Sequence, residues 1–194
     1  MKPSRLDWRR LFFIVGMALL LGIQAFQIPR RGIDPDELEH LHAAFCVWHN
    51  QIPYRDFFEH HAPALYWLAQ PAFWLTGASL DTLWLLRAAM WCCSAATVWQ
   101  VLRIGRHLGL TRAAETAAFW FVWSSIFQWK SLEFRPDVPA TLLICGAIAS
   151  LIRHRSGNVT AAVCAGLATL FTQKAIVPLA CLSLASWIID LACS

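Results

Sequence analysis

Four acidic residues lie between Asp34 and Glu39, directly after an apolar run long enough to cross a bilayer. Charge kept at a membrane surface has a solvation cost, so this group is a candidate functional site. Two of the acids have a structural explanation. Asp34 as a helix N-cap, Pro35 as the first helical residue and Glu37 as the third would together form a capping box. That explanation leaves Asp36 unassigned, so Asp36 is the first candidate for chemistry.

The composition indicates that these acids belong to a membrane protein. Hydrophobic residues make up 58% of the 194-residue chain and charged residues 14%, whereas about a quarter of a soluble domain is charged. The run Leu11–Ile28 contains only Gln24 and Gln27 as strongly polar residues, and it follows a basic segment. A signal peptide is the alternative interpretation, but the run is long for one and lacks a convincing cleavage site before Arg30. We therefore expect a retained span.

Neither the cysteines nor the net charge indicates another class of protein. Six of the seven cysteines fall inside apolar segments, only Cys46 lies in a polar loop, and no CxxC spacing occurs. We therefore predict neither a disulfide framework nor a zinc site built from cysteines. The net charge of +4 comes from basic residues at the ends of apolar segments, where they report orientation rather than nucleic-acid binding.

We expect one transmembrane module over residues 1–194, an all-α polytopic membrane helix bundle of about six spans. The predicted spans are 11–28, 83–102, 113–130, 138–152, 158–172 and 175–193. The apolar stretch 63–77 has only about 15 residues, fewer than the roughly 20 that a crossing needs. If that stretch lies along the outer surface, every basic cluster falls inside, with the N-terminus cytoplasmic: 2–10, 103–112 and 153–155. The first outer loop is then 29–82, and its acids share the outer face with the turn Glu133–Asp137.

Two interfacial helices are predicted in this loop, lying on the membrane at about 34–49 and 63–77. In the first, apolar residues recur at spacings of three, four and three, as on one helix face: Leu38, Leu41, Phe45 and Trp48. Asn50 follows, and asparagine tolerates the left-handed conformation at a helix C-terminus. Three tryptophans suit an interfacial position: Trp48, Trp67 and Trp74.

Short polar motifs follow one another along the predicted outer segments. They are Pro35-Asp36-Glu37, Pro53-Tyr54, Glu59-His60-His61-Ala62-Pro63-Ala64-Leu65-Tyr66-Trp67, Thr76-Gly77, Arg135-Pro136-Asp137 and Thr172-Gln173-Lys174. In this order they resemble the GT-C glycosyltransferases, with the protein O-mannosyltransferase and lipid A aminoarabinose transferase branch as the nearest relatives. The resemblance runs from about residue 11 to 190. It implies a polytopic enzyme that transfers a sugar from a polyprenyl-phosphate carrier to an acceptor on the non-cytosolic face.

The chain departs from the family pattern in two ways. Many relatives have a lysine before paired prolines in the loop, whereas here His60 and His61 occupy that region and Ala64 replaces the second proline. The phosphate-contacting role of that lysine is therefore not transferred. Members of the family are also longer, so we expect this chain to correspond to the N-terminal portion of such an enzyme.

The resemblance assigns Asp36 as the catalytic acid, with Glu37 beside it and Asp137 at the second outer turn. One carboxylate within hydrogen-bond reach can take the proton of the attacking hydroxyl, and phosphate leaves without a second acid. The expected outcome is inversion at the anomeric carbon. Each residue also has a structural explanation: Asp36 as a first-turn acid, Glu37 as a cap and Asp137 as a turn residue.

The departing phosphate needs cations, and the predicted outer face offers His60, His61, Arg135 and Lys174. Lys174 is also explained as an interfacial residue that snorkels to the headgroups. Arg135 is also explained as half of a local surface pair with Glu133. Arg87, near the outer end of its span, is a weaker candidate.

The histidines of the loop raise the question of a metal site: His40, His42, His49, His60 and His61. His40 and Asp36 lie four apart on one helix face, as a ligand pair could. No HExxH or comparable ligand set is present, so we assign no metal and expect no required cofactor. A divalent cation, if one binds, would suit the hard oxygens of Asp36 and Glu37, as magnesium and manganese do.

The expected location is the cell (inner) membrane, with the active face periplasmic or extracellular. The expected partners are a polyprenyl-phosphate sugar donor, a lipid, glycan or protein acceptor, and membrane lipids, with no nucleic acid. Two other functions stay open. A transporter or channel fragment would place ionisable residues inside the spans, whereas here the acids gather at one interface. A truncated, non-catalytic membrane protein would have lost its activity with its missing half.

Overall fold

The computed structural model describes residues 8–153 and 159–193, with side chains as far as Leu184. This part of the chain is helical and contains no strand, as the sequence predicts. Its elements are α1 (Trp8–Gln27), α2 (Pro35–Trp48), α3 (Ala64–Leu68), α4 (Gln70–Thr76), α5 (Leu80–His107), α6 (Thr111–Trp123), α7 (Ser125–Lys130), α8 (Asp137–Arg153), α9 (Val159–Phe171), the 3-10 turn η1 (Gln173–Ala175) and α10 (Ile176–Cys193). Four residues of the predicted basic clusters lie outside the described residues: Lys2, Arg5, His154 and Arg155.

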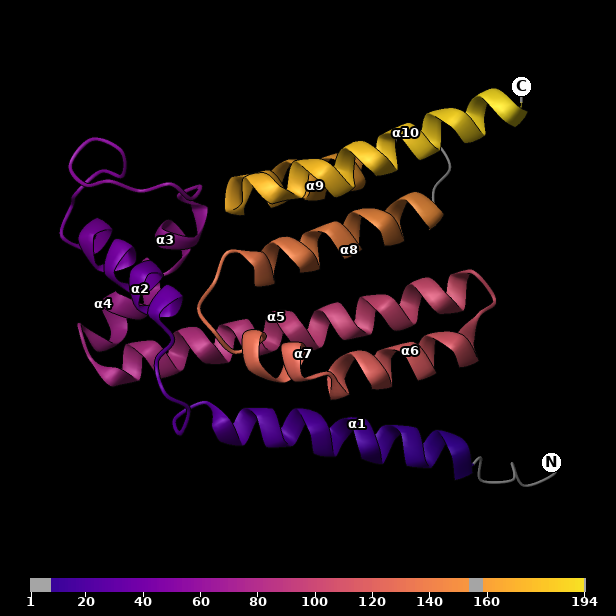
Figure 1. The fold of residues 1–194 in the computed structure, drawn as a ribbon, viewed down its shortest axis with the longest axis horizontal. Coiled ribbons are helices and arrows are strands. Elements are labelled where there is room, and N and C mark those ends of the chain that lie inside the picture. The colour runs from indigo at the N-terminus through magenta and orange to yellow at the C-terminus, as the bar shows by residue number, and fades with distance from the viewer. Residues whose placement is uncertain (1–7, 154–158, 194) are drawn as a thin grey trace.

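The long helices run side by side and alternate in direction along the chain, whereas α2, α3 and α4 lie together at one end (Figure 1). α5 contacts α1, α4, α6 and α8, and α8 in turn contacts α9. This alternation brings α2, residues 131–136 and η1 to one end, which we call the acidic end. The opposite end, which we call the basic end, holds the start of α1 and the α5–α6 connection. The charge bias of the sequence predicts the same grouping.

The six predicted spans are not confirmed by the lengths of the helices. In the part of the chain that the structure describes, only α1 and α5 are long and apolar enough to cross a membrane. α6 and α9 have 13 residues each and α8 has 17. At about 1.5 Å per residue, 13 residues extend roughly 20 Å, less than the roughly 30 Å of hydrocarbon in a bilayer.

The predicted span 113–130 is two helices rather than one. Ser124 leaves the helical conformation with φ −61° and ψ 141°, which ends α6 and begins α7. Its hydroxyl donates to the Phe121 carbonyl at 2.7 Å and accepts from the Phe127 backbone N–H at 3.3 Å. A serine that caps the following helix in this way competes with helix continuation.

The predicted helix 63–77 is also divided, at Ala69, into α3 and α4. Pro71 lies in the first turn of α4, and proline has no backbone N–H to continue the bonding of α3. Gly77, with φ +66°, then ends α4 in the left-handed region that glycine adopts without strain. The first predicted helix is confirmed as α2, and Asn50 has the predicted left-handed conformation, with φ +62°.

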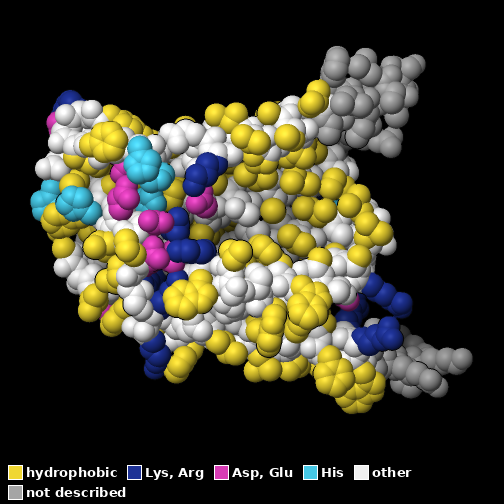
Figure 2. Space-filling view, viewed as in Figure 1, with side chains coloured by type: hydrophobic (Ala, Val, Ile, Leu, Met, Phe, Trp, Pro, Cys, Tyr) yellow, Lys and Arg dark blue, Asp and Glu magenta, His cyan; other side chains and the backbone are white. Residues whose placement is uncertain are grey.

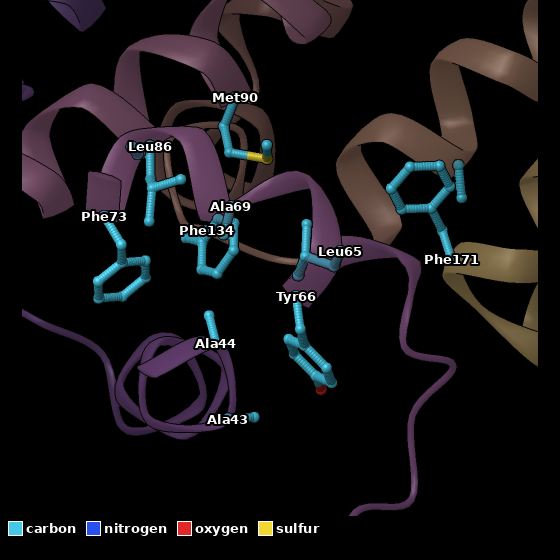
Figure 3. Packing of buried hydrophobic residues seen from close by; sticks show 12 residues of the cluster. Ala43, Ala44, Leu65, Tyr66, Ala69, Phe73, Leu86, Met90, Phe134 and Phe171 are labelled. Atoms are coloured by element: carbon cyan, nitrogen blue, oxygen red, sulfur yellow. The ribbon is translucent and has the colours of Figure 1, made fainter. Parts of the chain in front are cut away.

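The buried face of α2 differs from the predicted apolar stripe. Leu38 is 54% exposed, and the rest of the stripe is only partly buried. The buried residues of α2 are Glu37, His40, Ala43, Ala44 and Cys46, so Cys46 lies in a helix rather than in a polar loop. Ala43 and Ala44 face Leu65, Tyr66 and Phe134 in the core at the acidic end (Figure 3). Small side chains let α2 approach this core closely, so its polar residues at 37 and 40 are buried too.

Candidate functional site at the acidic end

Glu37 and Arg87 form a buried ion pair that joins α2 to α5. Arg87 donates to Glu37 through Nε at 2.9 Å and through Nη2 at 2.5 Å, and both side chains are at most 1% exposed. The remaining Arg87 N–H groups donate to the carbonyls of Ile28, Arg31 and Gly32 at 2.9–3.0 Å. The Phe134 backbone N–H donates to Glu37 Oε1 at 3.1 Å. Because its partners occupy both oxygens, Glu37 positions the neighbouring segments and has no free oxygen for a substrate.

This arrangement replaces half of the predicted capping box. Asp34 is the N-cap and Pro35 the first helical residue, as predicted, and Asp34 Oδ1 accepts from the Asp36 backbone N–H at 3.0 Å. Glu37, expected to complete the box at the N-cap, points to Arg87 instead. The guanidinium has five donors to offer, so it is the stronger partner for a buried carboxylate.

Glu133 is a second buried carboxylate, and three cations surround it. Its side chain is fully buried, and it accepts from Arg31 at 2.5 Å, from Lys130 at 3.0 Å and from Arg135 at 3.0 Å. The predicted surface pair with Arg135 is therefore a real contact but not a surface one. Lys130 also donates to Asp34 Oδ2 at 3.1 Å, and this hydrogen bond is the main reason that the pKa of Asp34 lies below its usual value.

Asp36 lies at the exposed edge of this charge cluster. Its Oδ2 is 2.8 Å from Arg135 Nη2, and 54% of its side chain is exposed, whereas Arg135 is 18% exposed. Asp137 lies 3.6 Å from Lys174 in a looser, more exposed pair. The structure thus brings Asp36, Arg135, Asp137 and Lys174 to the same end of the bundle, in two ion pairs. Figure 2 shows acidic and basic side chains gathered on the left of this view, next to a hollow.

An apolar cavity of about 560 Å³ begins beside Arg135. It lies between α5, α6, α7 and α8. Its walls are mainly apolar or hydroxyl-bearing, including Phe121, Phe127 and Val138, while Lys130, Arg135 and Asp137 are the charged residues in its lining. An apolar space with a few convergent charged groups at one place is the usual form of a ligand site.

His60 and His61 belong to a separate cluster, together with Glu59 and with Glu39 of α2. Glu59 Oε1 accepts from both histidine backbone N–H groups and from His61 Nδ1, each at 2.9 Å. The His60 ring lies 3.6 Å from Glu39. Burial alone would raise the pKa of Glu59, but hydrogen bonds from His61, Tyr66 and His60 outweigh burial and lower it.

His40 lies behind this cluster and is not paired with Asp36, contrary to the suggested ligand pair. Its Nδ1 is 3.2 Å from the Tyr66 hydroxyl, and its ring meets the His61 ring edge-on at 4.6 Å. Burial, and then the charge of His61, lower the pKa of His40 to about 4. His40 is therefore a neutral core residue near pH 7.

Five members of the two clusters had no individual site role in the sequence-based prediction, although three of them lie in the acidic stretch or the motifs quoted above: Arg31, Lys130, Glu39, Glu59 and Tyr66. Lys130 could have been recognised as a candidate from the sequence, because it is a lone charge at the end of an apolar segment. The other four lie near predicted site residues, but only the packing of α2 against α3, α5 and residues 131–136 selects their partners.

No protein-family model, curated protein or solved structure matches the chain.

Proposed function

We propose that this chain is a multi-spanning membrane protein that transfers a sugar from a polyprenyl-phosphate carrier, with its acidic end on the non-cytosolic side. One observation carries the proposal: Arg135 pairs with Asp36 at 2.8 Å and also lines the apolar cavity of about 560 Å³. A carboxylate, a phosphate-binding cation and a space for an isoprenoid chain are therefore adjacent.

The wide apolar surface supports the membrane location. Large apolar side chains stand exposed along most helices, for example Phe12 at 74%, Leu75 at 77% and Ile126 at 76%. Exposed apolar area on this scale is rare on soluble monomers and marks a membrane or protein contact. Figure 2 shows hydrophobic side chains spread over most of this face of the molecule.

In the proposed step the phosphate of the carrier binds Arg135 and Lys130, and its isoprenoid chain enters the cavity. Phosphate competes with Asp36 for Arg135, which frees the carboxylate for the acceptor hydroxyl. The acceptor oxygen bonds to the anomeric carbon on the face opposite the phosphate, and Asp36 takes the hydroxyl proton. The bond between that carbon and the phosphate oxygen breaks, its electron pair leaves with the phosphate, and the cations stabilise the charge.

The other predicted residues take different roles in this proposal. Asp137 lines the cavity and pairs with Lys174, and these two residues would orient the acceptor or the phosphate. Glu37 holds α2 in place through Arg87 instead of acting on the substrate. His60 and His61 lie with Glu59 and are not part of the phosphate site.

Asp36→Asn tests the proposal in membranes that contain the chain and a labelled polyprenyl-phosphate sugar. The amide keeps the size of the side chain but cannot take the proton, so we expect transfer to fall about 10²–10⁴-fold at an unchanged protein level. Asp56→Asn is the matched control, because Asp56 is a carboxylate of the same loop. Its partners within the described part of the chain are its neighbour Arg55 and the Ile52 backbone N–H. Equal transfer by wild type and Asp36→Asn would remove Asp36 from the mechanism.

The complete pairing of Glu37 and Glu133 favours a second candidate, a non-catalytic membrane protein whose charge cluster only joins helices. That candidate predicts no transfer above the level of membranes without the chain, together with a folded wild-type protein. The same assay therefore separates the two functions.

A further inference from the structure

The cluster around Glu59 offers metal ligands that the proposed sugar transfer does not use. Four side chains converge there: Glu39 from α2, and Glu59, His60 and His61 from the loop before α3. One ligand atom from each lies within 4.8 Å of the others. We propose that these four side chains bind a transition-metal ion of the zinc class, next to the sugar-transfer site but distinct from it.

Three of the six distances between the ligand atoms lie near the spacing expected around a tetrahedral ion. Bonds of about 2.0–2.1 Å to nitrogen and oxygen place neighbouring tetrahedral ligands roughly 3.3 Å apart. His60 Nδ1 lies 3.6 Å from Glu39 Oε1 and 3.8 Å from Glu59 Oε1, and His61 Nδ1 lies 2.9 Å from Glu59 Oε1. Shifts of a few tenths of an ångström in the histidine side chains would give all three pairs the tetrahedral spacing.

The two carboxylates of the cluster, Glu39 and Glu59, also favour the binding of a cation. At the acidic end, Asp34, Asp36, Glu37, Glu133 and Asp137 each pair with a lysine or arginine. Glu39 and Glu59 do not: among the described residues, their ion-pair partners are histidines alone. Two carboxylates held close together repel each other unless a cation lies between them.

A second layer of contacts holds the ligands in place. Glu59 is fixed by the two histidine backbone N–H groups and by a hydrogen bond from the buried Tyr66, which in turn contacts His40. The carbonyl of His60 accepts from Gln173 at 3.3 Å, which ties the loop to η1. Such outer contacts orient metal ligands and raise affinity.

The donor set selects the class of ion. Two imidazole nitrogens with two carboxylate oxygens suit zinc, whereas magnesium prefers oxygen and water alone in octahedral geometry. Binding would replace the hydrogen bond between His61 and Glu59 by two bonds to the ion, and it would release any proton held on the ligating nitrogen atoms. Uptake should therefore weaken as the pH falls.

The test uses the purified full chain in lipid nanodiscs, stripped with a chelator and titrated with Zn²⁺. We expect one ion per chain, an affinity at least tenfold lower in His60→Ala and in Glu39→Gln, and no change in His49→Ala. The first two side chains are about half exposed, so their loss leaves the packing intact. His49 is an exposed histidine of the same region outside the cluster, and helix content by circular dichroism confirms folding of each variant.

Two further measurements separate this site from adventitious binding. Tyr66→Phe removes only the hydroxyl behind Glu59, and we expect it to weaken Zn²⁺ binding about 10–100-fold. Co²⁺ bound to the wild type should give the intense visible absorption of a tetrahedral ion. Three outcomes would overturn the proposal. They are no stoichiometric uptake of Zn²⁺ by the chain, equal affinity for Zn²⁺ in the wild type and in the variants His60→Ala and Glu39→Gln, and complete displacement of Zn²⁺ by Mg²⁺. None of these readouts depends on sugar transfer.

Discussion

Arg87 is buried, and each of its five N–H donors has a hydrogen-bond partner in the interior. Arg87→Met would leave the Glu37 carboxylate buried without its cation. Removing one partner of a buried pair costs about 3–5 kcal/mol, so we expect a large fall in the free energy of unfolding. The midpoint of chemical denaturation in detergent measures this change.

The matched control for Arg87→Met is Arg106→Met in the same helix. Arg106 is exposed, and among the described residues it donates to the Leu102 carbonyl of its own helix alone, at 3.3 Å. Its substitution should change the free energy of unfolding by less than about 0.5 kcal/mol, with little shift of the midpoint. Similar midpoints for the two variants would show that the Glu37–Arg87 pair does not stabilise the fold.

His40 makes the stability of the acidic end depend on pH. Its pKa falls from 6.5 to about 4 on folding, first because of burial and then because of His61. The unfolded chain therefore binds the proton more readily than the folded chain between these two values. The free energy of unfolding is greatest above 6.5 and should fall by up to about 1.4 kcal/mol per pH unit as the pH drops toward 4.

The thermal unfolding midpoint between about pH 7 and about pH 4.5 measures this effect. In His40→Gln the amide can still contact Tyr66 but does not titrate, so the dependence on pH should become shallower. His107→Gln, at the exposed basic end of α5, should keep the slope of the wild type. An unchanged slope in His40→Gln would contradict the assignment.

At the scale of residues, the sequence predicted which side chains belong to the candidate site better than it predicted which side chains pair with one another. It singled out Asp36, Asp137, Arg135 and Lys174, and alternation along the chain was enough to place them at one end. It did not predict that Glu37 meets Arg87, because these residues are 50 positions apart and the rotation of α2 decides which side chains face α5. Glu133 looked like a surface acid for the same reason.

Among the elements, the contact between α5 and α6 depends on the absence of a side chain at Gly105. A Cβ atom added there would meet the Cβ of Ala114 at a distance that real Cβ atoms essentially never show. Gly105→Ala would push α6 away from α5, and overpacking of this kind costs about 1–3 kcal/mol. We expect a lower thermal unfolding midpoint.

Gly22→Ala in α1 is the matched control, because a Cβ atom at that position would meet nothing within 4 Å. Alanine favours a helix more than glycine does, so this variant should be neutral or slightly more stable. A destabilised Gly22→Ala together with an unchanged Gly105→Ala would contradict the close approach of α5 and α6.

The positions of helices were largely predictable, but their interruptions were not. Apolar periodicity predicts α2, and Asn50 correctly marks its end. The breaks at Ser124 and Ala69 were missed, since serine and proline also occur inside longer helices and only the local hydrogen bonds decide. The short lengths of α6 and α9 likewise do not follow from hydropathy, which extends past the ends of the helices.

Over the whole molecule, the proposal requires the acidic and basic ends to face opposite sides of a membrane. Cysteines introduced as Asp56→Cys and Arg106→Cys, in a chain whose native cysteines are replaced, report the two ends separately. An impermeant thiol reagent added to intact cells should label position 56 and leave position 106 unlabelled until the membrane is opened. Labelling of both positions from the same side would contradict the predicted arrangement, which rests on the positive-inside bias.

The most direct test of the central claim is the binding of a labelled polyprenyl phosphate to the chain in nanodiscs. If Arg135 holds the phosphate at the mouth of the apolar cavity, Arg135→Gln should bind about tenfold more weakly or worse, because a charge-assisted hydrogen bond is lost. Arg153→Gln, which removes a cation at the basic end, should bind like the wild type. Equal binding by wild type and Arg135→Gln, with both proteins folded, would contradict the account.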